Sequence, residues 1–305
     1  MKAVITGGLG FVGSALARRL DEIGAEVVLV DRLPADGVIA VDVGDAEAVR
    51  EVIGPGVDVV FHLASVVSGQ GEIDFDGAMR VNLEGTRNVL EACRLANTTP
   101  RLVFASTLAV FGGPAVHEVV GDDTKHTPQT TYGATKAACE LLVNDATRKG
   151  FLDGRTARLP TVVIRPGSPN AAASGFASAV FREPLSGVDY ALPVGLDVRM
   201  PLIGIRTAVE CLIRLAVADS DALGPDRALN LPAISVTVAE MVESLARVGD
   251  DRHLGRVTIE PDPVIQAIVR TWPTFTSFER ALALGLPRDE SLDDVVRAYI
   301  EDEVS

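Results

Sequence analysis

A tyrosine and a lysine four residues apart, Tyr132 and Lys136, are the residues of this sequence whose types and spacing best suit proton transfer. They lie in a segment with helical patterning, and side chains at positions i and i+4 share one face of a helix. The pKa of a tyrosine phenol is about 10, and a neighbouring ammonium group lowers it by stabilising the phenolate. We therefore expect Tyr132 to remove a proton from an alcohol with the help of Lys136. The alternative is that the pair lies on an ordinary exposed helix face.

A glycine-rich turn near the start of the chain is suited to hold the second reactant. The segment Thr6–Gly13 follows a strand-like run, Lys2–Thr6, and opens a helical pattern. Glycine permits a tight turn and a close approach of the backbone to a pyrophosphate, while free N–H groups of the following helix face the phosphates. The alternative is a purely structural turn. The residues expected to bind a dinucleotide here are Gly7, Gly10, Phe11, Val12 and Gly13.

An acidic residue, Asp31, ends the next strand-like run, about twenty residues after the glycines as the dinucleotide fingerprint requires. A carboxylate there bonds the adenosine ribose hydroxyls and repels a 2′-phosphate, so NAD is expected rather than NADP. Arg32 follows directly and could support some binding of NADP. Asp42, next to Val43, could bond the adenine amino group, although the role of an acid at a helix N-terminus fits it nearly as well. Lys136 could also hold the nicotinamide ribose.

The elements that must position these residues alternate between strands and helices. Short β-branched runs separated by amphipathic helices indicate a parallel sheet with helices on both faces, and continuously apolar runs fit strands buried on both sides. The expected fold class is therefore α/β, a doubly wound parallel sheet of the Rossmann type. Its strands are predicted at 2–6, 25–30, 38–43, 57–64, 101–106 and 161–165, and its helices at 11–23, 45–53, 74–96 and 132–148.

A change of pattern near residue 166 predicts a smaller C-terminal lobe. Prolines punctuate the stretch from Pro166 to Pro201, which reads as loops and short elements. We expect residues 1–165 to form an NAD-binding domain, and residues 166–305 to form mainly a substrate-binding lobe that is partly interleaved with the first. Helical patterns return at 207–218, 237–248, 264–270 and 278–284, and from about 292.

The composition narrows the class of protein. The chain of 305 residues carries a formal net charge of −14, which argues against nucleic-acid binding because such binding depends on basic patches. Three scattered cysteines, Cys93, Cys139 and Cys211, predict small buried thiols in a reducing compartment, and no His/Cys set with metal-ligand spacing suggests a metal site. No run approaches the roughly 18 apolar residues of a membrane helix, and no targeting segment is expected. We expect a soluble, cytoplasmic protein.

Several motifs together give nearly the whole chain a resemblance to the extended short-chain dehydrogenase/reductase family, the NAD-dependent epimerases and dehydratases. The resemblance implies a Rossmann-type fold, NAD as cofactor, and a homodimer formed through the helix near Asn82–Ala96 and the helix that carries Tyr132. The motifs are Thr6–Gly13, His62–Ser65, Asn82–Thr86, Ser106–Gly112, Tyr132–Lys136, and an ending at Arg280–Gly285 followed by Ser291 and Leu292.

The resemblance also implies roles by position. Leu63 and Ala64 would end a strand beside the cofactor, and Asn82 would contact the cofactor or order the site. Thr107 stands where the family usually has its catalytic serine, and its hydroxyl can still donate to a substrate oxygen. Ser106 is a rival for that role. A further departure is a phenylalanine, residue 111, where the family usually has tyrosine.

The segment from residue 158 to residue 187 decides the substrate, because fold and catalytic residues do not separate the activities of this family. It resembles the branch that oxidises the C2 hydroxyl of D-erythronate, a four-carbon sugar acid, to a 2-oxo acid. A carboxylate needs a cationic partner, and Arg182 is the first choice and Arg165 the second, although a salt bridge within the protein fits each about equally well. The residues suited to bind the hydroxyls are Asn170, Ser174 and Ser178.

Other polar residues and other functions stay open. His117, Lys125 and His126 precede Tyr132 and could line the mouth of the site, although a solvated loop fits them better, and His62 reads as a buried core histidine. One alternative function is a nucleotide-sugar epimerase or dehydratase that keeps NAD tightly bound. A second is an NAD-binding regulator without catalysis, which would not need its tyrosine–lysine pair.

Overall fold

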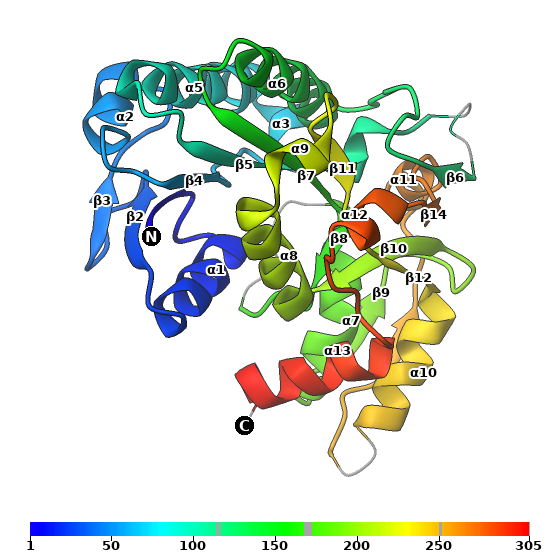
Figure 1. Ribbon diagram of the computed structural model, residues 1–305. Helices are drawn as coiled ribbons and strands as arrows, with labels where there is room; N and C mark the ends of the chain where they lie inside the picture. Colours follow the sequence, from blue (N-terminus) through cyan, green and yellow to red (C-terminus); the bar gives the residue numbers. More distant parts are fainter. Residues whose placement is uncertain (114–115, 117, 168–172, 250–251, 305) are drawn as a thin grey trace.

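A seven-stranded sheet forms the centre of the computed structural model, which describes residues 1–113, 116, 118–167, 173–249 and 252–304 (Figure 1). The strand order is β11-β7-β5-β4-β1-β2-β3, and every pair of neighbours is parallel. The chain moves outward from β1 in one direction to β3, then returns to β4 on the other side of β1. This confirms the Rossmann-type fold, and it places the reversal of strand order, where such sheets bind ligands, between β1 and β4.

The elements of this layer begin and end close to the positions that the sequence predicts for most of them. The third strand is shorter than expected, because it ends at Ala40 rather than at Val43. The elements are β1 (Lys2–Thr6), α1 (Phe11–Glu22), β2 (Glu26–Asp31), β3 (Val38–Ala40), α2 (Ala46–Val52), β4 (Val59–His62), α5 (Gly85–Ala96), β5 (Arg101–Thr107), α6 (Thr131–Arg148), β7 (Asp153–Leu159), α8 (Ile205–Val217), α9 (Ser220–Leu223) and β11 (Ala228–Asn230).

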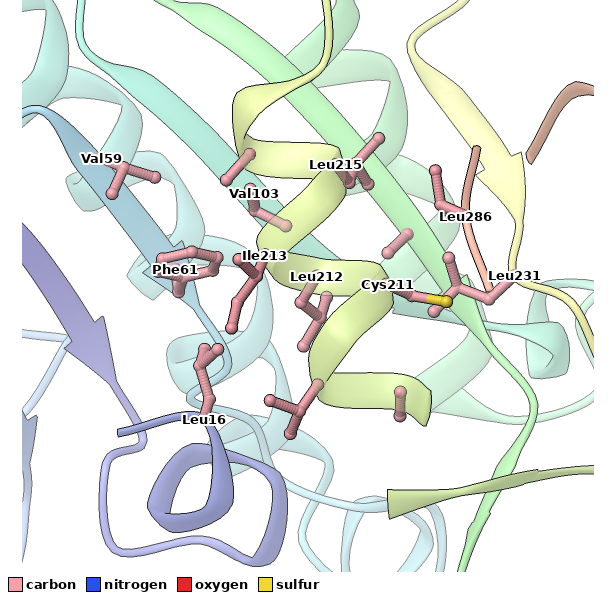
Figure 2. Packing of buried hydrophobic residues seen from close by; sticks show 14 of the residues in the cluster. Leu16, Val59, Phe61, Val103, Cys211, Leu212, Ile213, Leu215, Leu231 and Leu286 are labelled. Carbon is pink, nitrogen blue, oxygen red and sulfur yellow. The ribbon is translucent and has the colours of Figure 1, made fainter. Parts of the chain in front are cut away.

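Both faces of the sheet are covered, because successive side chains of a strand point to opposite sides. On one face, Ile5 and Phe61 pack against α1 and α8, where Figure 2 shows Phe61 close to Ile213. On the other face, Val4 and Phe104 pack against α2, α5 and α6. These two cores explain why the strands read as continuous apolar runs rather than alternating ones.

A helical path leads from the end of β4 toward α5, and it is more irregular than the single helix predicted from 74 to 96. It comprises α3 (Ser68–Ile73), α4 (Phe75–Ala78) and a π-helical turn at Met79–Glu84, which continues into α5. Such π-bulges occur frequently at functional sites. The turn carries the buried Asn82.

The strand expected at Thr161–Arg165 is wrong as a member of the main sheet, because β7 (Asp153–Leu159) takes that place. The sequence hides β7 because it carries two buried arginines in an otherwise short apolar run. Arg155 donates to Asp153 and to Ala218 O, and Arg158 pairs with Glu140, so both charges are compensated. The segment Thr161–Val163 is instead β8 of a separate three-stranded sheet.

The second lobe is built around that smaller sheet, of order β12-β10-β8, and a core of its own. Helix α7 covers part of a stretch that the sequence suggests is loops, while α8 and β11 return to the large sheet. The elements are β6 (Val119–Val120), β8 (Thr161–Val163), α7 (Phe176–Leu185), β9 (Tyr190–Leu192), β10 (Arg199–Gly204), β12 (Ile234–Thr237), α10 (Val238–Val248), β13 (Val257–Ile259), α11 (Pro263–Val269), β14 (Phe275–Thr276), α12 (Glu279–Ala283) and α13 (Leu292–Tyr299).

The three cysteines are buried, as the sequence predicts. Cys93, Cys139 and Cys211 are buried free thiols. Within the ranges that the structure describes, no helix is both long enough and apolar enough to cross a membrane.

Candidate active site

The N-terminus of α6 presents Tyr132 at the carboxyl edge of the large sheet. Thr130 caps the helix by accepting a hydrogen bond from Gly133 N at 3.0 Å, and Glu72 of α3 accepts one from Thr131 N at 2.8 Å. A Cβ at Gly133 would lie 2.2 Å from Ala109 O, so only glycine allows α6 to pack this closely on the turn that follows β5. Local capping and this close contact fix the tyrosine beside the end of β5.

Thr107 is the hydroxyl residue that faces Tyr132. The nearby hydroxyl of Thr107 favours the phenolate of Tyr132, but burial outweighs this effect and raises the pKa of Tyr132 above its ordinary value. This direction differs from the expectation that Lys136 lowers the pKa of Tyr132. The physical reason is desolvation, which disfavours a charged phenolate in a buried position.

Lys136 lies one helical turn after Tyr132 and is almost completely buried. Its ammonium donates to Ala105 O at 2.8 Å and lies 4.7 Å from the ring centre of Phe104 and 5.8 Å from that of Tyr132. Burial lowers the pKa of Lys136 to about 8, against opposing contributions from Cys139 and Glu140. The lysine therefore stands next to the phenol ring while its ammonium is held on the backbone of β5.

Ser106 and Thr107 are neighbours on β5, but their hydroxyls have different surroundings. Ser106 is 1% exposed, and its hydroxyl donates to the carboxylate of Glu140. Thr107 is only partly buried and accepts from Ala109 N at 3.1 Å. Adjacent strand residues point in opposite directions, so the two cannot share one role. This geometry favours Thr107 as the residue that meets a substrate oxygen.

A buried ion pair that the sequence analysis missed supports α6 from beneath. Glu140 and Arg158 are each 2% exposed, and three hydrogen bonds of 2.8 to 3.1 Å join them. Arg158 also donates to Asp122 O and contacts His126 Nε2, which fastens the loop before Tyr132. The spacing held a signal, because Glu140 lies four residues after Lys136 and so shares its helix face.

A chain of buried hydrogen bonds connects the glycine-rich turn to the helix α6. His62 Nδ1 lies 2.7 Å from the hydroxyl of Thr6, and its Nε2 lies 3.0 Å from that of Thr86. Thr86 donates to Asn82 O at 2.6 Å, so we assign the Nε2–H tautomer to His62. Burial, with the nearby charge of Lys136, lowers the pKa of His62 to about 3, which keeps the ring neutral.

Asn82 orders the loop after β4. Its Oδ1 accepts from Val66 N at 2.8 Å and from Ser65, and its Nδ2 donates to Val66 O at 3.1 Å and to Thr135 at 3.3 Å. These bonds join the π-helical turn, the loop from Ala64 and the helix α6. Among the two roles expected for Asn82, the described contacts are those of a residue that orders the site.

The turn between β1 and α1 is a cradle that side chains would fill. A Cβ at Gly13 would lie 2.2 Å from Gly7 O, and one at Gly7 would lie 2.7 Å from Ala64 N. The first helical residues, Phe11 and Val12, are partly buried, and the cap position of α1 has no side-chain hydrogen bond. Open backbone N–H groups at a helix N-terminus suit a pyrophosphate, so these residues fit NAD.

Asp31 closes this cradle at the end of β2. Its carboxylate accepts from Leu9 N at 3.1 Å and from Leu33 N at 3.2 Å, whereas Arg32 beside it is exposed. Partly buried Leu63 and Ala64 follow β4 across the reversal point. A carboxylate held at the end of β2 fits the ribose hydroxyls of NAD.

Asp42 is already occupied by partners within the protein. Burial acts against ionisation, but hydrogen bonds from Arg80 at 2.7 Å and from Gly44 N at 2.8 Å hold the pKa of Asp42 below its ordinary value. Its neighbour Val43 is buried in the core that α5 covers. An adenine amino group would therefore share the carboxylate with Arg80.

In the second lobe, the residues expected to bind substrate fall into three groups. Arg165, Ser178 and Arg182 lie together, because Ser178 accepts from Arg165 N at 3.0 Å and Arg182 donates to Arg165 O at 3.0 Å. Ser174 is partly buried in a short turn before α7. Asn170 and His117 lie outside the described residues. Lys125 is exposed, and no group of three His, Cys, Asp or Glu residues in the described ranges could hold a metal ion.

Comparison with known proteins places this geometry in a family. The model of the NAD-dependent epimerase/dehydratase family matches residues 3–231. The chain belongs to this NAD-dependent epimerase/dehydratase family. The cofactor of this family member is therefore NAD, in agreement with the cradle at Gly7 and Gly13.

Two relatives with enzyme names match this epimerase/dehydratase chain over almost its whole length. D-erythronate dehydrogenase of Cupriavidus necator is 45% identical, with 99% of this chain and 98% of the relative covered. D-erythronate dehydrogenase of Haemophilus influenzae is 40% identical, with 99% of each covered. A solved structure described as a nucleoside-diphosphate-sugar epimerase from Agrobacterium tumefaciens is 39% identical, with a TM-score of 0.92 and coverage of 100% and 94%. These relatives show that the chain is an NAD-dependent oxidoreductase.

Proposed function

We propose that this enzyme oxidises the C2 hydroxyl of D-erythronate to the 2-oxo acid. The observation that carries the proposal is the match, over nearly the full length of both chains, to two proteins named D-erythronate dehydrogenase. The geometry supports the same chemistry, because the hydroxyl of Thr107 lies near the phenol of Tyr132 and the ammonium of Lys136 lies 5.8 Å from the centre of the phenol ring.

The cofactor supplies the oxidising power. When bound, NAD would supply the hydride acceptor for C2 and a positive charge that opposes the effect of burial on the pKa of Tyr132. Gly7, Gly13 and Asp31 would hold its adenosine diphosphate half, because they form the cradle at the reversal of strand order. Lys136 would hold the nicotinamide ribose.

The chain's own residues move the proton. Tyr132 accepts the proton of the C2 hydroxyl, and proton transfer of this kind contributes roughly 100- to 10,000-fold to the rate. Thr107 donates to the same oxygen as it becomes a carbonyl. Asn82 keeps the loop at Val66 and the helix α6 in place, so the reacting groups stay aligned.

The proposal is tested by following NADH absorbance when the purified enzyme and NAD meet a panel of four-carbon sugar acids. We expect rapid NADH formation with D-erythronate and a slower reaction with its stereoisomers. The variant Tyr132→Phe should lose at least about 100-fold in kcat while it still binds NAD. No NADH from any acid in the panel would contradict the proposal.

A second candidate function follows from the solved structure named as a nucleoside-diphosphate-sugar epimerase, which covers the whole of this chain. Such an enzyme would interconvert sugar isomers without net formation of NADH. UDP-sugars therefore belong in the same panel, with product isomers measured by chromatography. Isomers from a UDP-sugar, together with silence toward the acids, would replace the first function by the second.

We further propose that the enzyme is a homodimer that pairs through α5 and α6. Leu95 of α5 and Leu141 of α6 are apolar yet half or more exposed, at 50% and 67%, on the outer layer formed by these helices (Figure 1). An isologous interface would cover both. Light scattering of wild type and of Leu141→Lys tests this pairing: a mass of two chains that falls to one supports it, and a wild-type monomer contradicts it.

A further inference from the structure

We propose that Arg165 binds the carboxylate of the substrate, and that Arg182 and Ser178 are positioning residues that hold Arg165 in place. This inference rests on the proposed function, because it concerns an acid substrate. The sequence favours Arg182 over Arg165, and the described contacts reverse that order.

The guanidinium of Arg182 is already committed to other groups. Its Nε and Nη2 donate to Glu183 Oε1 at 2.9 and 2.6 Å, and its Nη1 donates to Arg165 O at 3.0 Å. Its side chain is 8% exposed. A substrate carboxylate would have to displace Glu183, whose side chain is 24% exposed, and would leave this partly buried anion without its cation.

Arg165 differs from Arg182 because hydrogen bonds fix its backbone, while one nitrogen of its guanidinium has no partner among the described residues. Its N–H donates to Ser178 and its carbonyl accepts from Arg182, so both sides of its peptide are fixed by one face of α7. Its Nη1 is buried and has no hydrogen-bond partner among the described residues. An unpaired guanidinium nitrogen shielded from water is unfavourable unless an anion or acceptor meets it.

The location of Arg165 suits a substrate ligand. Leu159, at the end of β7, is in register with Thr107 of β5, so the chain leaves the large sheet beside the candidate catalytic residues. It then forms β8 and reaches Arg165 at the carboxyl end of that strand. Ligands of open α/β sheets bind at this carboxyl edge, and in Figure 1 β8 lies between the large sheet and the helices of the second lobe.

Other basic residues near this edge are occupied or exposed. Arg158 is saturated by Glu140 and Asp122 O, and Lys136 donates to Ala105 O. Lys125 is exposed to solvent. Arg165 therefore remains the candidate with both a buried donor and a fixed backbone. A guanidinium also matches a carboxylate with two parallel N–H groups, which a lysine cannot do.

The test compares Arg165→Met and Arg165→Lys with Arg247→Met, a matched control that removes an exposed arginine from α10. We expect Arg165→Met to raise the KM for D-erythronate by about 100-fold or more, as truncation of a buried charge pair does, with the KM for NAD unchanged. Arg165→Lys should raise the KM for D-erythronate by less than Arg165→Met does, because the positive charge remains but the two parallel N–H groups of the guanidinium are lost. A further variant, Arg165→Ala, removes the whole side chain, and added guanidinium ion should restore part of its activity. Arg247→Met should equal wild type.

The outcomes separate this inference from the proposed function. If wild type fails to oxidise D-erythronate, the function fails and the inference falls with it. If wild type oxidises D-erythronate while Arg165→Met keeps its KM within threefold, only the inference is overturned. NAD binding by each variant, measured by calorimetry, shows that it is folded, so a raised KM then reports the lost carboxylate contact.

Discussion

The variant Glu140→Gln tests whether the buried ion pair beneath α6 supports the fold and the site. Arg158 directs three hydrogen bonds of 2.8 to 3.1 Å at Glu140, and both side chains are 2% exposed, so water cannot replace the carboxylate. Glutamine has nearly the same shape but no charge, and its NH₂ group would face the N–H groups of Arg158 or the hydroxyl of Ser106.

The expected magnitude follows from the loss of one member of a buried pair. Removing one partner leaves an uncompensated charge and costs about 3–5 kcal/mol. At about 2 °C per kcal/mol for a chain of this size, the Tm should fall by about 6–10 °C. A double-mutant cycle uses the single variants Glu140→Leu and Arg158→Met and the double variant that carries both. The double variant removes both charges, so its loss of stability should be smaller than the sum of the losses of these two single variants by about 2 kcal/mol or more.

Urea unfolding followed by circular dichroism measures these free energies, with Arg247→Met as a surface control. Steady-state assays should show a fall in kcat for Glu140→Gln larger than its effect on the KM for NAD, because the pair supports α6 and Ser106 rather than the glycine-rich turn. A single variant within 1 kcal/mol of wild type, or strictly additive losses, would refute the reasoning.

Three further predictions concern the cofactor and pH. Gly13→Ala places a Cβ 2.2 Å from Gly7 O, so the Kd for NAD measured by calorimetry should rise about tenfold or more, while Gly54→Ala, which meets open space, should not change it. Asp31→Ala should lower kcat/KM with NAD by about 10- to 100-fold and raise it with NADP; an unchanged ratio would count against the ribose contact. The pKa of His62 falls from 6.5 to about 3 on folding, so its stabilising contribution is complete above pH 6.5 and is lost as pH falls toward 3. The loss is up to about 5 kcal/mol. Acid unfolding of His62→Gln should lack this slope, and an equal slope would contradict the neutral tautomer.

The sequence predicts the parts of this fold that depend on local pattern. Apolar runs, the glycine turn and the tyrosine–lysine spacing are local features, and the first strands, α1 and α6 lie where they are expected. The strand β7 was missed because Arg155 and Arg158 interrupt its apolar pattern. Arg155 pairs with Asp153 of the same strand and donates to the distant Ala218 O, and Arg158 pairs with the distant Glu140. Periodicity along one segment carries no information about such distant compensation.

The candidate site likewise combines features that follow from local sequence pattern with features that depend on contacts between distant residues. The type and spacing of Tyr132 and Lys136 predict their shared helix face, but the choice between Ser106 and Thr107 requires the position of Glu140. The order of Arg165 and Arg182 likewise depends on which guanidinium Glu183 occupies. The sequence predicts both members of each pair as candidates, and the contacts of Glu140 and Glu183 in the fold favour one over the other.

The proposed function requires the transfer of a hydride from C2 of D-erythronate to NAD. Its most direct test uses D-erythronate deuterated at C2 and measures the NADH by mass spectrometry. Hydride transfer from C2 should give NADH that carries one deuterium and a 2-oxo acid that carries none at C2. Unlabelled NADH together with a product that retains deuterium at C2 would show oxidation at another carbon and contradict the proposed function.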